Sequence, residues 1–228
     1  VGGAYSCSYC YISSLIDNLN EAYEGTGIRP PSIIQDRDLN TVIREGEEII
    51  RLDKIYGVPT TAVFDQADIS LNNIEWWKSL SDFWMKEIKI PFYIQARPAM
   101  LSGAAGIRRI EVIKKSNLVA GISMAIESGD EKIRKHLLDR NEPNKVILDA
   151  IKNVKSFGIP LRTQAIVALP VMKPSVTIDA SKTNLSLVDK DGEEYYYDDP
   201  LNESIKCLEL VCLSDFSTED YYWNAIYS

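Results

Sequence analysis

The stretch Val119-Ala120-Gly121-Ile122-Ser123-Met124-Ala125-Ile126-Glu127 decides the fold class of this chain. Its apolar run predicts a buried strand over 119–126 that ends at Glu127. Helical patterns flank the strand, at 107–115 before it and at 131–138 after it. A buried strand between two helices is the building unit of a parallel sheet, because a crossover helix returns the chain to the same edge.

The same alternation of strand and helix patterns continues in both directions along the chain. Further strands are predicted at 60–64, 91–96, 161–169 and 221–226. Further helices are predicted at 38–56, 73–88, 143–157 and 201–213. Gly57 and Gly158 follow two of these helices as stop signals. The alternation implies right-handed βαβ units and a parallel sheet, which is either open or curled into a barrel.

One segment, 174–199, interrupts the alternation. Lys190-Asp191-Gly192 separates two β-forming runs, and Asp-Gly in such a place predicts a tight hairpin. We therefore expect one domain over 1–228 with a hairpin inserted at 174–199. The hairpin is either a flap over one face of the sheet or a solvated decoration.

The composition is that of an ordinary globular protein. The 228 residues include 45% hydrophobic and 25% charged residues, which suffices for a sizeable core. The net charge of −8 argues against a nucleic-acid partner, because proteins that bind the phosphate backbone usually carry a basic surplus. No apolar stretch reaches the length of a membrane span. Four cysteines do not form a disulfide scaffold at this length, so we expect a reduced, cytoplasmic protein.

Both ends of the sequence indicate a piece of a longer protein. The chain begins with Val1 instead of methionine and closes on Tyr227-Ser228. We therefore expect a fold that is truncated at both ends.

The pair Cys7-Ser8-Tyr9-Cys10 is the clearest chemical signal. Two cysteines three positions apart in a reduced protein indicate a metal site, an iron–sulfur cluster or a redox pair. Zinc is the weakest of these, because it usually takes four ligands and no second Cys or His pair lies nearby. Cys207 and Cys212 lie on a predicted helix among apolar residues, so we expect them to be packing residues.

Charged residues follow three of the predicted strands. Asp65, Arg97 and Glu127 stand at or just past the strand ends, where reactive groups of parallel sheets gather. Gln95 and Arg97 are expected at the same edge, although Arg97 could equally form a structural ion pair. His136 is the only histidine and is expected at the surface, which leaves no basis for a nucleophilic triad.

Several of these motifs together resemble one family. Residues 2–11 resemble the cluster loop of radical S-adenosylmethionine (SAM) enzymes, a Cys-x3-Cys-x2-Cys pattern with an aromatic residue before the last cysteine. Residues 121–129 are similar to a strand end of the B12-binding, methylthiotransferase-like branch, which often carries a cobalamin domain upstream. Residues 150–170 resemble the helix and strand that follow in that branch. The resemblance implies a partial TIM-type (β/α)6 barrel, truncated at both ends, with the inserted hairpin.

The resemblance also implies a chemistry. A [4Fe–4S] cluster would bind SAM and cleave it reductively to a radical that acts on an unknown, small-molecule or other substrate. Cys7 and Cys10 would be metal ligands, and Tyr9 would pack near the adenine of SAM. Flavodoxin or ferredoxin would supply the electron, and cobalamin could bind a domain upstream.

Six further residues are expected to bind the cofactor. By the resemblance, Asp65 would accept from the ammonium of SAM, Glu127 from its ribose hydroxyls, and Arg140 would pair with its carboxylate. A surface salt bridge is the alternative for Arg140. The remaining three residues complete the expected cofactor site: Gln95, Arg97 and Ser128.

The chain departs from the family pattern at one position. Gly3 stands where the first cysteine of the cluster loop is expected. Two thiolates hold such a cluster poorly, because a third iron then lacks a protein ligand. The chain is therefore an altered copy of an active enzyme, a protein with another ligand, or a barrel without a cluster that binds a small molecule or partner without catalysis.

Overall fold

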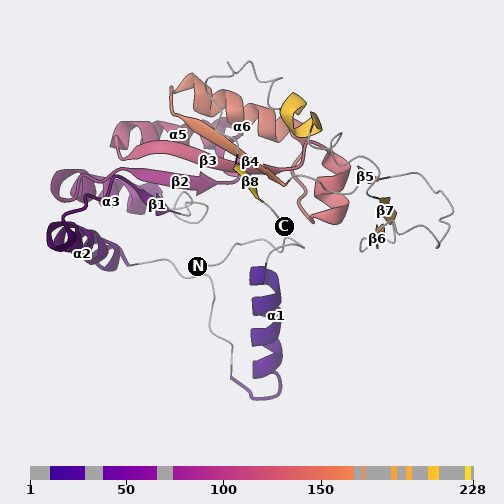
Figure 1. Ribbon diagram of the computed structural model, residues 1–228, viewed down its shortest axis with the longest axis horizontal. Coiled ribbons are helices and arrows are strands. Elements are labelled where there is room, and N and C mark those ends of the chain that lie inside the picture. Colours follow the sequence, from indigo (N-terminus) through magenta and orange to yellow (C-terminus); the bar gives the residue numbers. More distant parts are fainter. Residues whose placement is uncertain are drawn as a thin grey trace.

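A parallel five-stranded sheet forms the centre of the molecule (Figure 1). The computed structural model describes residues 11–28, 38–65, 74–166, 171–172, 186–188, 194–196, 205–210 and 224–226. The strands are β1 (Val63–Asp65), β2 (Phe92–Ala96), β3 (Val119–Glu127), β4 (Leu161–Ile166) and β8 (Asn224–Ile226). They pair in the order β1-β2-β3-β4-β8, and every pairing is parallel. The predicted α/β class is confirmed, and this arrangement is consistent with a partial TIM-type barrel.

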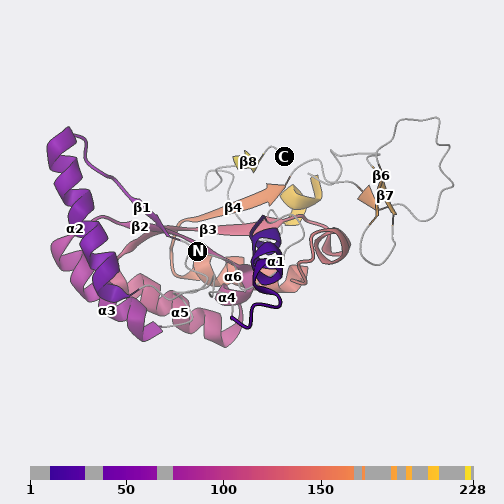
Figure 2. The ribbon, with the colours of Figure 1, turned by 90° about the horizontal axis from the view of Figure 1, so that it is seen from below.

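Long helices connect β1, β2, β3 and β4 and lie along one face of the sheet, whereas the first two helices of the chain precede β1 (Figure 2). The helices are α1 (Tyr11–Tyr23), α2 (Leu39–Tyr56), α3 (Ile74–Glu87), α4 (Pro98–Leu101), α5 (Gly103–Ser116), α6 (Asn144–Ser156), the π-helix η2 (Ile133–Leu137) and a further helix at 205–210. Helices α3, α5 and α6 lie on the same side of β2, β3 and β4 (Figure 2). The sequence did not predict α1 or α4, and it predicted the start of α5 at 107 instead of Gly103.

Local capping explains why α2 was predicted correctly. The Asp38 side chain accepts a hydrogen bond from the Thr41 amide at 3.1 Å, which satisfies an N–H group of the first turn. Gly57 adopts a left-handed conformation at φ 68°, and its N–H bonds the carbonyl of Asp53 at 2.9 Å. Helix α5 starts differently, because the Gly103 amide bonds the Asp149 carboxylate at 2.6 Å, from α6. That partner lies 46 residues away and leaves no local signal in the sequence.

The face of the sheet toward the helices holds the hydrophobic core. Ile94, Ile122 and Met124 are at most 1% exposed. Trp84 packs against Phe92 with ring centroids 4.7 Å apart, and its indole N–H bonds the Ile90 carbonyl at 2.7 Å. The core is expected to be the main source of stability, because burial of apolar area is the dominant favourable term in folding. The predicted core position of the Trp76–Trp77 pair is confirmed for Trp77, which is 1% exposed.

The opposite face of the sheet is polar. Alternation along the strands places Gly121, Ser123 and Ala125 of β3 on the face away from the core. The flanking strands present longer side chains there, and Gln95 of β2 donates to Gln164 of β4 at 3.0 Å, across β3. Small residues on the central strand thus leave room for polar side chains from its neighbours.

A second, three-stranded sheet contains the predicted hairpin. It comprises β5 (Val171–Met172), β6 (Ser186–Val188) and β7 (Glu194–Tyr196), in the order β5-β7-β6. Strands β6 and β7 are antiparallel, with Ser186 opposite Tyr196 and Val188 opposite Glu194. This pairing is the one expected around Lys190-Asp191-Gly192, while its interpretation as an insertion in one domain stays a prediction. Within the described part of the chain, no helix combines the length and the apolar character that a membrane span requires.

Candidate functional site

The carboxyl end of β3 makes an unusual turn. Glu127 has φ 62°, the left-handed region that side chains with a Cβ rarely adopt. The Ser128 amide bonds the Ile126 carbonyl at 2.8 Å, so the chain reverses direction within two residues. The pairing of β3 with β4 shifts register between Ala125 and Glu127 at the same point. Backbone strain of this kind is tolerated where the surroundings hold it in place, and it is frequent at functional sites.

Four buried charged residues meet next to this turn. The Arg140 guanidinium donates to Glu127 at 2.6 Å and to Glu142 at 2.8 and 3.2 Å. It also donates to the Ala125 carbonyl at 3.0 Å. Arg97, directly after β2, donates to the other oxygen of Glu142 at 3.1 Å. We call Arg97, Glu127, Arg140 and Glu142 the ion cluster; their side chains are between 4% and 12% exposed.

The ion cluster holds equal numbers of positive and negative side chains. Burial alone would raise the pKa of the Glu142 carboxyl, but the charges of Arg140 and Arg97 and their hydrogen bonds outweigh it, so this pKa lies below its usual value. Glu142 is therefore ionised at neutral pH. Desolvating these charges is expensive, and the cost is offset only by close pairing of the kind seen here.

The segment after the turn contains the π-helix η2. The Leu138 amide bonds the Ile133 carbonyl at 3.1 Å, five residues earlier, and Ile133 and Leu138 are buried. Arg134 lies between them and is 0% exposed. Sequence reasoning missed Arg134 and Glu142. For Arg134 the available signal was a charged residue inside the apolar pattern of a predicted helix, whereas Glu142 lies between two predicted helices and carries no such signal.

The helix at 205–210 packs against the same turn from another side. The Gly129 amide donates to the Cys207 sulfur at 3.0 Å, and Lys206 forms an ion pair with Asp130 at 2.8 Å. Burial would raise the pKa of Asp130, but the bond from Lys206 and two backbone amides lower it overall. Cys207 is 1% exposed, so its prediction as a packing residue is confirmed. Cys212 lies outside the described residues.

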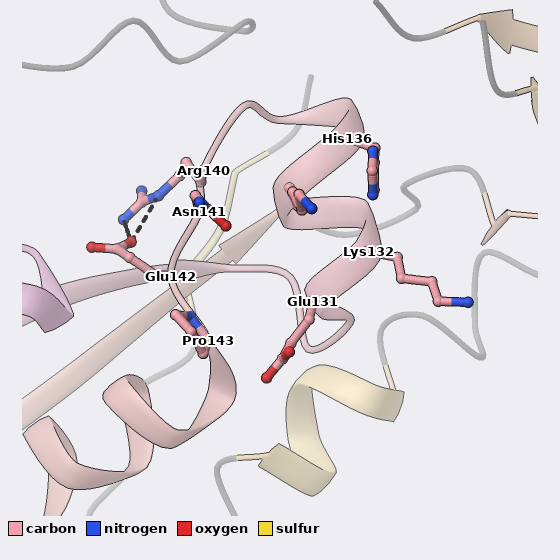
Figure 3. A pocket seen from close by; sticks show the side chains of 8 residues that line it. Glu131, Lys132, His136, Arg140, Asn141, Glu142 and Pro143 are labelled. Atoms are coloured by element: carbon pink, nitrogen blue, oxygen red, sulfur yellow. Dashed lines mark hydrogen bonds and ion pairs between the residues drawn. The ribbon is translucent and has the colours of Figure 1, made fainter. Parts of the chain in front are cut away.

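A cavity of about 200 Å³ opens beside the ion cluster. Arg140 and Glu142 line it, and Figure 3 shows them pointing toward each other, with Lys132 and His136 directed away from the pair. The remaining lining residues are Glu131, Lys135, Asn141 and Pro143. His136 was expected at the surface and is half-buried at this cavity. The ion cluster thus borders open space and is not sealed inside the core.

The structure brings together four of the sequence-predicted site residues. Arg97, Glu127 and Arg140 belong to the ion cluster, and Ser128 is buried at 0% exposed in the adjoining turn. Both interpretations of Arg97 remain open, because it forms an ion pair and also stands at a strand end. The surface salt bridge considered for Arg140 is wrong, since its ion pairs are buried.

The other predicted site residues lie elsewhere or outside the described side chains. Gln95 projects from β2 toward Gln164, to which it donates a hydrogen bond, and is not a member of the ion cluster. Asp65 ends β1, and its side chain is outside the described part. Cys7, Tyr9 and Cys10 precede the first described residue, so their roles stay predictions. Among the residues that the structure does describe, no group of three potential metal ligands occurs.

The ion cluster holds two kinds of charged group that can recognise a polar ligand. Carboxylates accept hydrogen bonds from hydroxyl and ammonium groups, and a guanidinium pairs with a carboxylate through two parallel bonds. Both types of group stand at the carboxyl ends of adjacent parallel strands, where ligands of such sheets usually bind.

Three solved structures show similarity to this chain. The cobalamin-dependent SAM radical enzyme OxsB has a TM-score of 0.51 and 18% identity, over 64% of this chain and 22% of that chain. Coproporphyrinogen III oxidase (HemN) from Escherichia coli, described as a radical SAM enzyme, has a TM-score of 0.43 and 11% identity, over 60% and 33%. SuiB of Streptococcus suis, bound to SAM, has a TM-score of 0.38 and 10% identity, over 95% and 53%. The chain spans about a fifth of the length of OxsB.

A family model covers most of the chain. Residues 1–179 match the model of the radical SAM superfamily, whereas no curated protein matches. The match includes the cysteine pair, the end of β3 and the ion cluster. It confirms the resemblance drawn from residues 2–11 and 121–129. The chain belongs to the radical SAM superfamily.

Proposed function

We propose that this chain is the core of a radical SAM enzyme that binds SAM beside the ion cluster and a [4Fe–4S] cluster at Cys7 and Cys10. The observation that carries the proposal is the buried set Arg97, Glu127, Arg140 and Glu142 at the strand ends of a parallel sheet, in a member of this superfamily. Buried, paired charges that border a cavity are candidates for a functional site, because a purely structural role rarely needs them.

Each member of the site has a proposed role toward SAM. Glu127 accepts hydrogen bonds from the ribose hydroxyls, and Arg140 pairs with the carboxylate of the methionine part. Glu142 and Arg97 keep Arg140 oriented, because both oxygens of Glu142 are bonded, one to each arginine. Asp65 accepts from the ammonium group, and the remaining contacts with the cofactor come from Tyr9, Gln95 and Ser128.

The thiolates of Cys7 and Cys10 would hold the iron–sulfur cluster, since thiolates are the usual protein ligands of such clusters. When bound, that cluster supplies the electron for reductive cleavage of the sulfonium, and a carbon radical results. Flavodoxin or ferredoxin is the proposed electron donor in the cytoplasm. Cobalamin is a further candidate cofactor, because OxsB is cobalamin-dependent. The substrate is a small molecule or another molecule of unknown class.

A second candidate function follows from Gly3. A barrel with two thiolates in its cluster loop could bind a small molecule or partner without a cluster. The two functions differ in iron content and in chemistry under reducing conditions.

The experiment that separates them is anaerobic reconstitution followed by an iron count and by assay of methionine and 5′-deoxyadenosine under dithionite. An enzyme is expected to bind iron, up to the four atoms of a [4Fe–4S] cluster, and to release both products. Cys7→Ala and Cys10→Ala should lose this iron, whereas Cys207→Ala should keep it, because Cys207 is buried against Gly129.

Gly3→Cys tests the third ligand directly. It is expected to raise the iron content and the yield of 5′-deoxyadenosine, since it restores the third thiolate. If both the original chain and Gly3→Cys stay colourless and release no 5′-deoxyadenosine, the enzyme function is wrong and the second candidate is favoured.

A further inference from the structure

Arg134 is a charged side chain that is completely buried, at 0% exposed. Its Nε donates to the Glu142 carbonyl at 3.1 Å, and its two terminal nitrogens donate to the Ser128 carbonyl and the Asn144 Oδ1. Burial lowers the pKa of this guanidinium, and the nearby charges of Glu131 and Glu142 oppose that effect. Three oxygen acceptors thus compensate a desolvation cost that would otherwise be large.

The contacts of Arg134 reach every segment that carries Glu127, Arg140 or Glu142. Ser128 follows Glu127 in the strained turn, and the Glu142 carbonyl belongs to the cluster residue itself. The backbone carbonyl of Arg134 accepts from the Arg140 amide at 2.7 Å. One residue therefore bonds the main chain at or next to three members of the ion cluster.

We infer that Arg134 is a positioning residue that fixes the relative placement of the Glu127, Arg140 and Glu142 side chains. The inference deepens the proposed function and rests on it for the step to SAM binding. The guanidinium is planar, and its donors have fixed directions, so it holds three acceptors in one arrangement. An ammonium group is a compact point charge on a flexible stem and does not reproduce this geometry.

An apolar residue at position 134 would pack against Ile133 and Leu138, which form an apolar cluster. It could not donate to the Ser128 and Glu142 carbonyls, and a buried acceptor that loses its donor costs stability. A purely structural role predicts that this loss destabilises the whole molecule. A positioning role predicts that it loosens the turn after β3 and weakens SAM binding.

The experiment compares Arg134→Lys and Arg134→Met with a control, Lys152→Met. Lys152 is an exposed residue of α6 that does not line the cavity beside the ion cluster. SAM binding is measured by calorimetry on the anaerobically prepared full chain. Both Arg134 variants are expected to bind SAM about 10- to 100-fold more weakly, as when an outer residue that orients a ligand is removed. Lys152→Met is expected to bind SAM with unchanged affinity.

Amide hydrogen exchange supplies a readout that needs no cofactor. The amides of Ser128, Gly129 and Arg140 are hydrogen-bonded in the turn and its surroundings, and they should exchange faster in both Arg134 variants. The Phe92 and Ile122 amides, bonded at the start of β2 and within β3, should keep their rates.

Exchange rates and SAM affinity together decide whether Arg134 is a positioning residue. Unchanged exchange at the turn, with SAM affinity equal to that of the original chain, overturns the inference. A uniform rise in exchange rates that includes the Phe92 and Ile122 amides overturns the inference as well, because such a rise indicates a general loss of stability. If the original chain itself does not bind SAM, the proposed function fails, while local exchange at the turn still decides whether Arg134 positions these residues.

Discussion

Glu142 shows how a single carboxyl links the ion cluster to stability. One of its oxygens accepts from Arg97 and the other from Arg140, and its side chain is 8% exposed. Burial raises the pKa of this carboxyl, but the two arginines favour its charged form more strongly. Its pKa in the folded protein is therefore lowered. A group with a lowered folded pKa contributes stability above its unfolded pKa, and this contribution is lost as the pH falls through the folded value.

Glu142→Gln is expected to lower the free energy of unfolding at pH 7 by about 1–3 kcal/mol, since charge-assisted bonds to two buried arginines are lost. It should also flatten the pH dependence of stability below the usual value for glutamate, 4.5. Denaturant unfolding at pH 7 and at intervals down to pH 3 measures both effects.

The matched control is Glu48→Gln, which removes a carboxylate from the exposed pair with Arg51 on α2. This variant should unfold at nearly the same denaturant concentration as the original chain, because exposed ion pairs contribute little to stability. If the free energy of unfolding of Glu142→Gln falls toward pH 3 as steeply as that of the original chain, the assigned role of Glu142 is contradicted.

For Glu127, the sequence predicted the position in the fold but not the backbone conformation. Its place at the end of β3 was predicted, because the apolar run stops there. Its φ of 62° was not, since glutamate has no local preference for the left-handed region. The conformation is maintained by contacts from Arg140, and through Ser128 from Arg134, which lie 13 and 7 residues further along the chain.

At the scale of elements, the helix at 205–210 depends on a glycine. A Cβ at Gly129 would overlap the backbone of Lys206 and Cys207, so only glycine lets the helix approach the turn this closely. The approach permits the Gly129–Cys207 bond and the Asp130–Lys206 ion pair. Gly129 lies directly after Glu127 and Ser128, so the helix supports the same turn as Arg134 from another side.

Gly129→Ala is expected to displace this helix and to cost about 1–3 kcal/mol of stability, as overpacking in well-packed regions does. Thermal unfolding measures the cost, and a crystal structure would report the distance between Lys206 and Asp130.

Gly57→Ala is the control, because a Cβ there meets nothing within 4 Å and only the left-handed φ opposes it, at about 1 kcal/mol. A Gly129→Ala structure with the Asp130–Lys206 ion pair intact would contradict the steric argument.

The π-helix η2 shows what an apolar pattern says about an element and what it leaves undetermined. The sequence predicts a short helix over 131–138, and the structure has π-helical bonding over Ile133–Leu137. The apolar spacing of Ile133 and Leu137 does not distinguish these two hydrogen-bond patterns. Within this helix Arg134 donates to the carbonyls of Ser128 and Glu142, which lie outside it.

At the scale of the whole molecule, the two faces of the sheet have different chemistry. Ile122 and Met124 of β3 pack into the core, while Ser123 between them faces the other way. Ser123 is 3% exposed, and its hydroxyl has no hydrogen-bond partner among the residues that the structure describes. A buried hydroxyl without a partner costs stability.

Ser123→Ala is therefore expected to leave stability unchanged or to raise the free energy of unfolding by up to about 1–3 kcal/mol, because the desolvated hydroxyl disappears. Denaturant unfolding measures the change. Thr163→Ala is the control, since it removes a buried hydroxyl from the core face of β4, and it should destabilise by leaving a small cavity. Destabilisation by Ser123→Ala of the same size would show that the Ser123 hydroxyl has a partner.

The sequence by itself determined the alternation of strands and helices, the parallel sheet, the Asp38 and Gly57 ends of α2, and the family to which the cysteine pair and the 121–129 motif belong. Those features follow from apolar periodicity, turn chemistry and spacing, all of which act between residues close in the chain. Only the tertiary structure decided that Arg134 and Glu142 are buried, that Arg97 after β2 pairs with Glu142, and that the 205–210 helix supports the turn after β3. The reason is that charged residues are buried only where partners from other segments compensate their desolvation, and Arg97 and Glu142 are partners 45 residues apart.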